Sequence, residues 1–208
     1  MKPIYRYAPV FLSTMLALGV AGAQTSLDVH AGVSGANASS SGQSINTFGD
    51  GTFYNTPSLE GAFLNFGAGV MLTPHFGFGG EFSFKPNKSD YAGLQYRPMF
   101  YDFNGIFHPA PGSKRIVPEI QSGIGGVNLR FYDPQSNCNV FTGCSSQSTY
   151  LQSSNHFQWH AGAGVKFFVT SSIYVEPKFD VHYVHNFFQF GTNWVPQYGL
   201  NVGYRFGD

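Results

Sequence analysis

Residues 157–169 have the sequence FQWHAGAGVKFFV, and this stretch decides the fold. Its alternate positions from Phe157 to Val169 are all apolar, whereas the intervening positions are mostly small or polar. A helical interpretation fails, because the third, fourth and seventh positions after Phe157 are His, Ala and Gly, which make no apolar stripe. A period of two is typical of a β-strand, whose successive side chains point to opposite faces. The stretch therefore predicts a strand with one wholly apolar face.

Other segments of the chain show the same alternation and are separated by turn-forming residues. Most of them have the 9 to 11 residues or so that a tilted strand needs to cross a bilayer. The predicted strands cover residues 25–35, 61–72, 76–85, 93–107, 116–132, 156–170, 173–184 and 195–206.

The connections between these strands alternate between short and long. Residues 73–75, 108–115 and 171–172 make short connections, whereas residues 36–60 and 133–155 make the longest ones. Short turns on one side and long loops on the other are typical of outer-membrane barrels, whose short turns are periplasmic. We therefore predict an all-β fold, an eight-stranded antiparallel up-and-down transmembrane β-barrel with both termini in the periplasm.

The composition favours a membrane barrel over a soluble protein. Charged residues make up 11% of the 208 residues and aromatic residues 17%, whereas a soluble domain usually carries about a quarter charged residues. No uninterrupted apolar stretch reaches the roughly 18 to 20 residues that a spanning helix needs. The formal net charge is zero and the basic residues are scattered, so we do not expect nucleic acid as a partner.

Residues 1–23 have the pattern of a secretory signal peptide. Lys2 and Arg6 precede an apolar stretch, and a small-residue Ala-Gly-Ala cleavage site follows at residues 21–23. We expect this segment to be removed after the chain crosses the inner membrane. The mature protein would then be one outer-membrane β-barrel domain over residues 24–208.

The last predicted strand ends in YGLNVGYRF, residues 198–206. This segment resembles the C-terminal assembly signal that the barrel-insertion machinery reads, with Gly199 followed by alternating Val202, Tyr204 and Phe206. Gly and Asp follow this Phe at the end of the chain, whereas many outer-membrane barrels with this signal end on the aromatic residue.

With its strand pattern and this ending, the whole mature chain resembles one family of outer-membrane β-barrels. The family includes the transmembrane domain of outer-membrane protein A and its small eight-stranded relatives. The resemblance implies a location in the outer membrane and contact with its lipid. It also implies recognition by the barrel-assembly machinery and extracellular loops that are available to a ligand.

The predicted inward faces carry charged side chains. An eight-stranded barrel is just wide enough for side chains to fill, and buried charges need partners. Glu119 and Lys166 come to similar heights on adjacent strands, so we expect an ion pair; Asp28, Asn104 and Gln121 also point inward, and Arg97 is a further basic candidate. The expected lumen network, which would plug the barrel, consists of Glu81, Asp102, Glu119, Lys166, Glu176, Lys178, Asp180 and Arg205.

We predict no catalytic residue, metal site or cofactor. Outer-membrane acyltransferases and deacylases need a hydroxyl or carboxylate near a His. His182, His185 and Asp180 are the only local candidates, and no serine motif accompanies them. Asp180 and His182 share a face but lack a third partner. His156 and His160 are four residues apart, a spacing that separates them by about 13 Å on a strand.

Two predicted strands contain close sets of glycines, between Gly77 and Gly80 and between Gly123 and Gly126. Neither set forms a phosphate-binding loop. Within a strand, glycine permits barrel curvature or close packing of the lumen side chains.

Cys138 and Cys144 lie in the long connection 133–155. In an exported protein with an even number of cysteines, this favours a disulfide within the loop. The bridge would restrain a segment rich in Asn, Gln and Ser, with a gain of about 2 kcal/mol for such a small ring.

We expect an integral outer-membrane barrel with a structural role in the envelope and no enzymatic activity. Three alternatives stay open. A narrow porin-like diffusion channel would require a continuous water path past the inward charges, and a surface adhesin would bind through its loops. A soluble periplasmic barrel would turn its apolar face inward around a ligand, but its other face here holds mostly Gly, His and Ser with scattered charges.

Overall fold

The computed structural model describes residues 25–38, 43–46, 49–113, 115–139, 143–187 and 190–207, without the side chains of 136–139 and 143–146. The signal peptide expected over residues 1–23 lies outside the described residues. Within the described ranges, no helix has the length and apolar character needed to cross a membrane.

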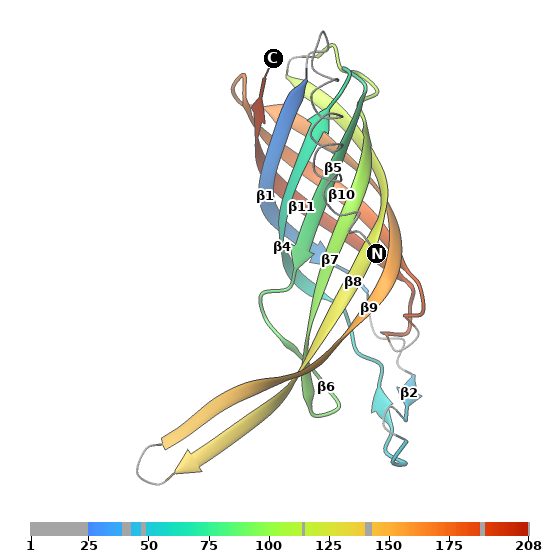
Figure 1. Cartoon of the computed structure of the whole chain (residues 1–208), viewed down its shortest axis with the longest axis vertical. Helices are drawn as coiled ribbons and strands as arrows, with labels where there is room; N and C mark the ends of the chain where they lie inside the picture. Colours follow the sequence, from blue (N-terminus) through green and yellow to red (C-terminus); the bar gives the residue numbers. More distant parts are fainter. Residues whose placement is uncertain are drawn as a thin grey trace, which may run out of the picture.

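Eight long strands form a closed antiparallel barrel, which confirms the predicted fold class (Figure 1). They are β1 (Ser26–Ala36), β4 (Gly61–Met71), β5 (Phe76–Phe84), β7 (Leu94–Phe107), β8 (Ile116–Asn139), β9 (Gly143–Phe168), β10 (Ile173–Val184) and β11 (Trp194–Phe206). Each strand pairs with its neighbour along the chain, and pairing of β1 with β11 joins the ends. Three short strands, β2 (Ser44–Ile45), β3 (Tyr54–Asn55) and β6 (Ser89–Tyr91), lie in the connections.

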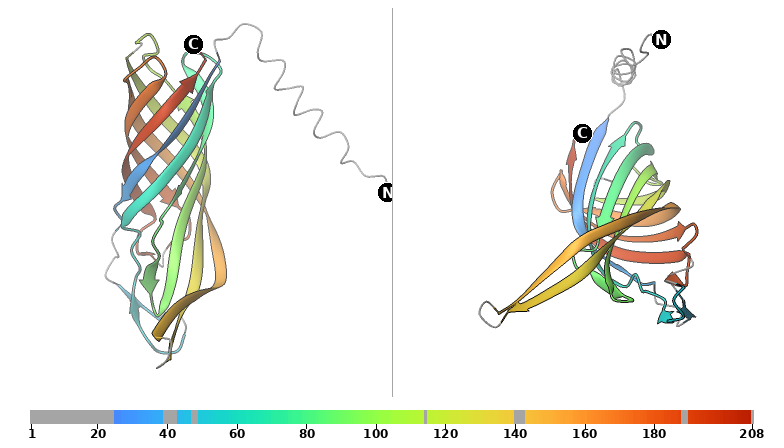
Figure 2. Two further views of the ribbon diagram at one scale, coloured as in Figure 1. Left: turned by 90° about the vertical axis from the view of Figure 1, so that its left-hand side faces the viewer. Right: turned by 60° about the horizontal axis from the view of Figure 1, so that its bottom comes forward.

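The two ends of the barrel differ in their connections. At one end, residues 72–75, 108–113 and 169–172 lie in the short connections between strands. β1 begins and β11 finishes at this same end, because Leu27 pairs with Phe206. The longer connections and the far end of the β8–β9 hairpin lie at the opposite end (Figures 1 and 2). This is the arrangement predicted from the alternating connection lengths.

Side-chain alternation divides each barrel strand into an outward and an inward face. In β9, Phe157 and Trp159 are 57% and 40% exposed, whereas Gln158 and His160 are 0% and 1% exposed. The outer surface is therefore built of large apolar side chains, which suit a lipid surface and not water. The register predicted for residues 157–169 is confirmed.

The connection between β5 and β7 contains a hairpin that the sequence analysis did not predict. β6 pairs with the start of β7, and Tyr91 lies opposite Leu94 across the turn residues Ala92 and Gly93. Both turn residues have positive φ, 51° and 81°, as a two-residue type I′ turn requires. Ala-Gly lacks the Asn or Asp that makes such turns easy to predict from sequence.

β8 and β9 continue beyond the barrel as a paired arm, residues 132–139 and 143–150 (Figure 1). The predicted loop over residues 133–155 is therefore wrong, since most of this segment is strand. A register shift between Phe131 and Tyr132 marks the base of the arm. Such a bulge bends a strand and increases its twist, which accounts for the change in direction at this point.

Side chains at the base of the arm make contacts of their own. The rings of Tyr132 and Tyr150 meet edge to face, with centroids 6.0 Å apart. Lys88 Nζ lies 4.1 Å from the centroid of the Tyr132 ring. Further out, the backbone places Cys138 directly opposite Cys144. Their side chains lie outside the described residues, so the disulfide stays a prediction.

Candidate functional site

The barrel lumen gathers charged side chains from every barrel strand except β4. They include nearly all of the polar residues predicted to point inward. The carboxylates are Asp28, Glu81, Asp102, Glu119, Glu176 and Asp180, and the Lys and Arg side chains are Lys166, Lys178 and Arg205.

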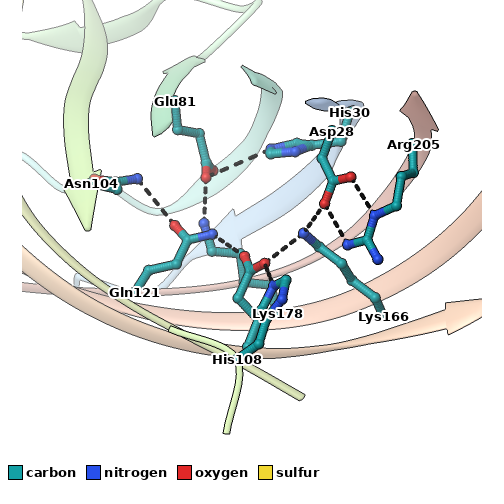
Figure 3. Close-up of polar contacts among 10 residues, drawn as sticks. Asp28, His30, Glu81, Asn104, His108, Gln121, Lys166, Lys178 and Arg205 are labelled. Carbon is teal, nitrogen blue, oxygen red and sulfur yellow. Dashed lines mark hydrogen bonds and ion pairs between the residues drawn. The ribbon is translucent and has the colours of Figure 1, made fainter. Parts of the chain in front are cut away.

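Near the short turns, Asp28 of β1 binds two cations (Figure 3). Arg205 of β11 donates from Nε and Nη2 to the two Asp28 oxygens at 2.7 and 2.8 Å. Lys166 Nζ of β9 lies 2.8 Å from Asp28 Oδ2 and 2.5 Å from Glu119 Oε2. The structure thus brings together Glu119 and Lys166, which the sequence analysis expected to pair, and adds Asp28 as a second carboxylate.

Glu119 continues this cluster across β8 and β7. Its Oε2 lies 2.8 Å from His108 Nε2, and its Oε1 accepts a hydrogen bond from Gln121 Nε2. Asn104 Nδ2 in turn donates to Gln121 Oε1 at 3.1 Å. The sequence analysis missed His108 because it lies just beyond the strand end. Continuing the inward positions Asn104 and Ile106 by two residues identifies it.

A second cluster surrounds Lys178 in the middle of the lumen. Its Nζ contacts Glu81 of β5 and lies 3.3 Å from Asp180 Oδ2. His30 of β1 completes the cluster, with Nε2 3.8 Å from Glu81 Oε2. The structure therefore joins three more of the predicted network residues, and it adds His30.

Glu176 does not join either cluster, although it was predicted as a network member. Its side chain is 0% exposed on β10, between Tyr174 and Lys178 on the same face. Neither carboxylate oxygen has a hydrogen-bond partner among the described residues. Glu176 therefore lies in the lumen, as predicted, but it makes no hydrogen bond with the other network residues that the structure describes.

A third cluster joins Asp102 of β7 with His160 of β9 and His182 of β10. His160 Nδ1 lies 3.5 Å from Asp102 Oδ1, and the two imidazole rings stack with centroids 5.2 Å apart. Gln158 Nε2 donates to Asp102 Oδ1 at 2.5 Å. The sequence analysis predicted Asp102 as a network residue but missed its two imidazole neighbours.

Glycines of β8 make this third cluster possible. Gly125 lies opposite Asp102 on one side and Gln158 on the other, and Gly123 lies opposite His160. A Cβ at Gly125 would stand 2.8 Å from Asp102 Oδ1 and closer still to backbone. Because β8 presents no side chain here, a residue of β7 can reach residues of β9. Close packing of lumen side chains was one of the two roles predicted for these glycines.

An apolar cluster fills the lumen near the long loops. The rings of Phe63 and Phe100 meet edge to face at 5.7 Å, and those of Phe187 and Phe190 stack at 4.3 Å. Tyr96 donates its hydroxyl to the carbonyl of Ser58 in the β1–β4 connection. The full cluster is Ala36, Ala38, Leu59, Phe63, Tyr96, Phe100, Val127, Leu129, Val184, Phe187, Phe190 and Val195.

Sequence reasoning missed the apolar cluster because it treated the inward face as polar along the whole barrel. Near the long loops, both faces of the strands are apolar or aromatic, as Phe100 inward and Tyr101 outward show. Leu59 and Phe187 come from connections, whose position no strand periodicity can give. A local run of apolar residues on both faces is the signal for this region.

A cavity of 520 Å³ lies at the short-turn end of the lumen. His108, Arg205 and four hydroxyl side chains contribute its polar groups, and Val117, Phe168 and Met71 are among its apolar lining residues. Arg205 and His108 also belong to the charge cluster around Asp28 and Glu119, so the cavity borders that cluster.

The residues considered for catalysis do not form one site. His182 and Asp180 point into the lumen, whereas His185 follows β10 and is exposed. His156 lies near the apolar cluster, with its ring 5.3 Å from that of Phe187. Arg97, the further basic candidate, lies outside the lumen network and donates to the carbonyl of Pro86 at 3.0 Å.

Comparison with known proteins gives the family and similar folds. The family described as outer membrane protein beta-barrel domain matches residues 9–206. The outer membrane protein OprG of Pseudomonas aeruginosa is 10% identical, with a TM-score of 0.55 over 89% of this chain and 98% of that chain. Neisserial surface protein A is 14% identical, with a TM-score of 0.53 over 88% and 96%.

Ail, the attachment invasion locus protein of Yersinia pestis, is also 14% identical, with a TM-score of 0.52 over 88% of this chain and 99% of that chain. No curated protein sequence matches significantly. At these identities the solved structures show a shared fold, whereas the family match extends over nearly the whole chain. This chain therefore belongs to the outer membrane protein beta-barrel domain family, and its location is the outer membrane.

Proposed function

We propose that the protein is a closed outer-membrane barrel with a structural role in the envelope, and neither a diffusion channel nor an enzyme. The observation that carries this proposal is the filling of the lumen by two layers. Paired charges occupy the part from the short turns to the middle of the lumen, and the apolar cluster occupies the part near the long loops. A porin needs a continuous water path, which both layers oppose.

The two layers oppose ion flow for different physical reasons. In the charged layer, the Lys and Arg side chains are held by carboxylates and fill the space between the strands. In the apolar layer, Phe63, Phe100 and Val127 are each 0% exposed. A hydrophobic constriction excludes water and raises the barrier to an ion. Together they favour a closed barrel.

Recording from planar lipid bilayers that contain the purified mature protein tests the proposal. We expect no steady single-channel current from the wild type. Steady, large conductance steps that scale with salt concentration would contradict the closed barrel and favour the porin-like alternative.

We further propose that β11 carries the assembly signal read by the barrel-assembly machinery. Val202, Tyr204 and Phe206 lie on its outward face and are 55%, 41% and 50% exposed. Gly199 lies opposite Ser34 of β1, at the seam where the first and last strands close the barrel. These apolar and aromatic side chains on the outward face of the last strand would be accessible to the machinery before the seam forms.

Binding of a partner outside the cell is a second candidate function, and the β8–β9 arm favours it. The arm extends past the barrel (Figure 2) and exposes Tyr150, which is 54% exposed, beside Leu151 at 48%. Exposed aromatic and apolar side chains are common at binding surfaces. Phe131 and Gln152 are opposite each other at the base of the arm, so a two-residue turn between them removes the arm together with Tyr150 and Leu151.

Whole cells that carry the shortened arm test this candidate. We expect weaker adherence to immobilised matrix proteins and glycosaminoglycans than with the wild type, at equal surface levels of the barrel. Equal adherence of the two strains would remove the binding role of the arm.

A further inference from the structure

The Asp102, His160 and His182 cluster has the chemistry of a metal site. One ligand atom from each residue can be chosen so that all three lie within 4.8 Å of one another. The three residues come from β7, β9 and β10 and are 6%, 1% and 5% exposed. Two imidazoles and a carboxylate are a common ligand set for divalent transition metals, with Zn²⁺ holding N and O ligands at about 2.0 to 2.2 Å.

Two buried ring nitrogens of this cluster point to a ligand-binding role. The Nδ1 atoms of both His160 and His182 are buried without a hydrogen-bond partner among the described residues. Buried polar atoms in folded proteins nearly always have partners, and an ion is one explanation for those that do not. A metal bound by the imidazole nitrogens would satisfy both atoms.

The positions of the ligands are fixed by the barrel. His160 and His182 lie directly opposite each other in the β9–β10 register, which places their side chains side by side on the inward face. Gln158 donates to Asp102 Oδ1 and so orients the carboxylate. Residues that hydrogen-bond to the ligands have this role in metal sites. The ring of Phe100 lies 5.1 Å from that of His182 and separates the cluster from the long-loop end.

The charges of the lumen also favour a cation here. The other clusters pair their carboxylates with Lys or Arg, through Lys166, Lys178 and Arg205. Asp102 forms no ion pair with Lys or Arg among the described residues, and the ionisable side chain beside it is His160, with Nδ1 3.5 Å from Asp102 Oδ1. A buried carboxylate without such a partner is costly, and a divalent cation would neutralise it.

We propose that the lumen binds one divalent transition-metal ion, most simply Zn²⁺, through Asp102, His160 and His182. The ion would link three strands from inside the barrel, at the boundary between the charged and apolar layers. This inference does not depend on the structural role proposed above, because a barrel that conducts could hold the same ion.

Titration of tag-free, chelator-treated mature protein in detergent micelles with Zn²⁺ tests the proposal. We expect one tightly bound Zn²⁺ per barrel and a higher unfolding temperature when Zn²⁺ is present. Co²⁺ in its place should give the visible absorption bands of a metal with nitrogen and oxygen ligands. A wild-type protein that binds no Zn²⁺ and unfolds at the same temperature with and without it would overturn the site.

Variants then separate the lumen site from histidines elsewhere. His160→Gln, His182→Gln and Asp102→Asn should each weaken Zn²⁺ binding at least tenfold, whereas His30→Gln, a change of another lumen histidine, should leave it unchanged. Gel mobility without heating checks that each variant is a folded barrel. Tight binding that persists in all three variants would place the ion elsewhere and overturn the proposal. If a variant does not fold, the wild-type titration and Co²⁺ spectrum still decide the question.

Discussion

Lys166 contacts two carboxylates, Asp28 and Glu119, while only 3% of its surface is exposed. Removing one partner of a buried ion pair leaves the other charge without compensation, which costs about 3 to 5 kcal/mol. We therefore expect Lys166→Ala to lower the free energy of unfolding by this amount. Urea unfolding of the refolded protein in micelles, followed by tryptophan fluorescence, measures the change.

A matched control comes from Arg97, which lies outside the lumen network and contacts a backbone carbonyl. Arg97→Ala should change the free energy of unfolding by less than about 1 kcal/mol, as surface substitutions usually do. Equal stability of Lys166→Ala and the wild type would show that the lumen charges are hydrated and do not depend on one another.

Phe179 lies in the middle of β10 and is 49% exposed on the outward face. A basic residue that faces lipid at the centre of a bilayer costs about 2 to 4 kcal/mol, and much less near the rim. We expect Phe179→Arg to destabilise the barrel by this amount in lipid vesicles. Ile173→Arg, at the first residue of β10, should cost at most about 1 kcal/mol. Equal costs at the two positions would contradict the assigned membrane depth.

At the residue scale, sequence could predict which side chains share a face but not all of the side chains that meet. Glu119 and Lys166 lie on neighbouring strands at similar heights, so simple counting brought them together. Asp102 and His160 lie on strands separated by β8. Their contact requires glycine at 123 and 125 and the curvature of a closed barrel. The alternation of faces along a strand gives no information on either of these features.

At the scale of elements, the predicted strands agree with the structure where one face meets lipid. The apolar alternation arises because lipid covers one face, so it identifies β9 only as far as the barrel extends. Beyond Phe131, residues of the arm pair through their backbones, and the sequence of the arm is rich in Ser, Asn and Gln without an apolar alternation. Backbone pairing leaves no apolar period in the sequence, which is why residues 133–155 were predicted as a loop.

Cys138 and Cys144 are direct neighbours across the arm, which supports the predicted disulfide, since a bridge needs close Cβ atoms. We expect intact cells to react with a membrane-impermeant maleimide only after treatment with a reductant. Labelling that depends on the reductant would show that the arm lies outside the cell and that its two cysteines form a disulfide. Labelling of untreated cells would contradict the disulfide. Labelling only after the outer membrane is opened would contradict the topology.

At the scale of the whole molecule, the lumen has a boundary that composition could not reveal. The sequence predicted a charged plug along the barrel, and among the described residues the paired charges lie near the short turns and in the middle of the lumen. The part nearer the long loops holds an apolar cluster that includes Leu59, Phe187 and Phe190 from the connections. Strands and loops therefore share one apolar core. A prediction from strand patterns alone treats strands and loops as separate parts.

This division predicts which layer prevents conduction. In Lys166→Ala, the apolar cluster remains in place, so water that enters the charged layer still meets a dry constriction. Phe63 and Phe100 contact each other at the centre of that cluster, and the double change Phe63→Ala, Phe100→Ala removes two large rings from it. We expect bilayer recordings to show channel activity for the double variant and none for Lys166→Ala. Conduction by Lys166→Ala together with a silent double variant would mean that the charged layer alone closes the barrel.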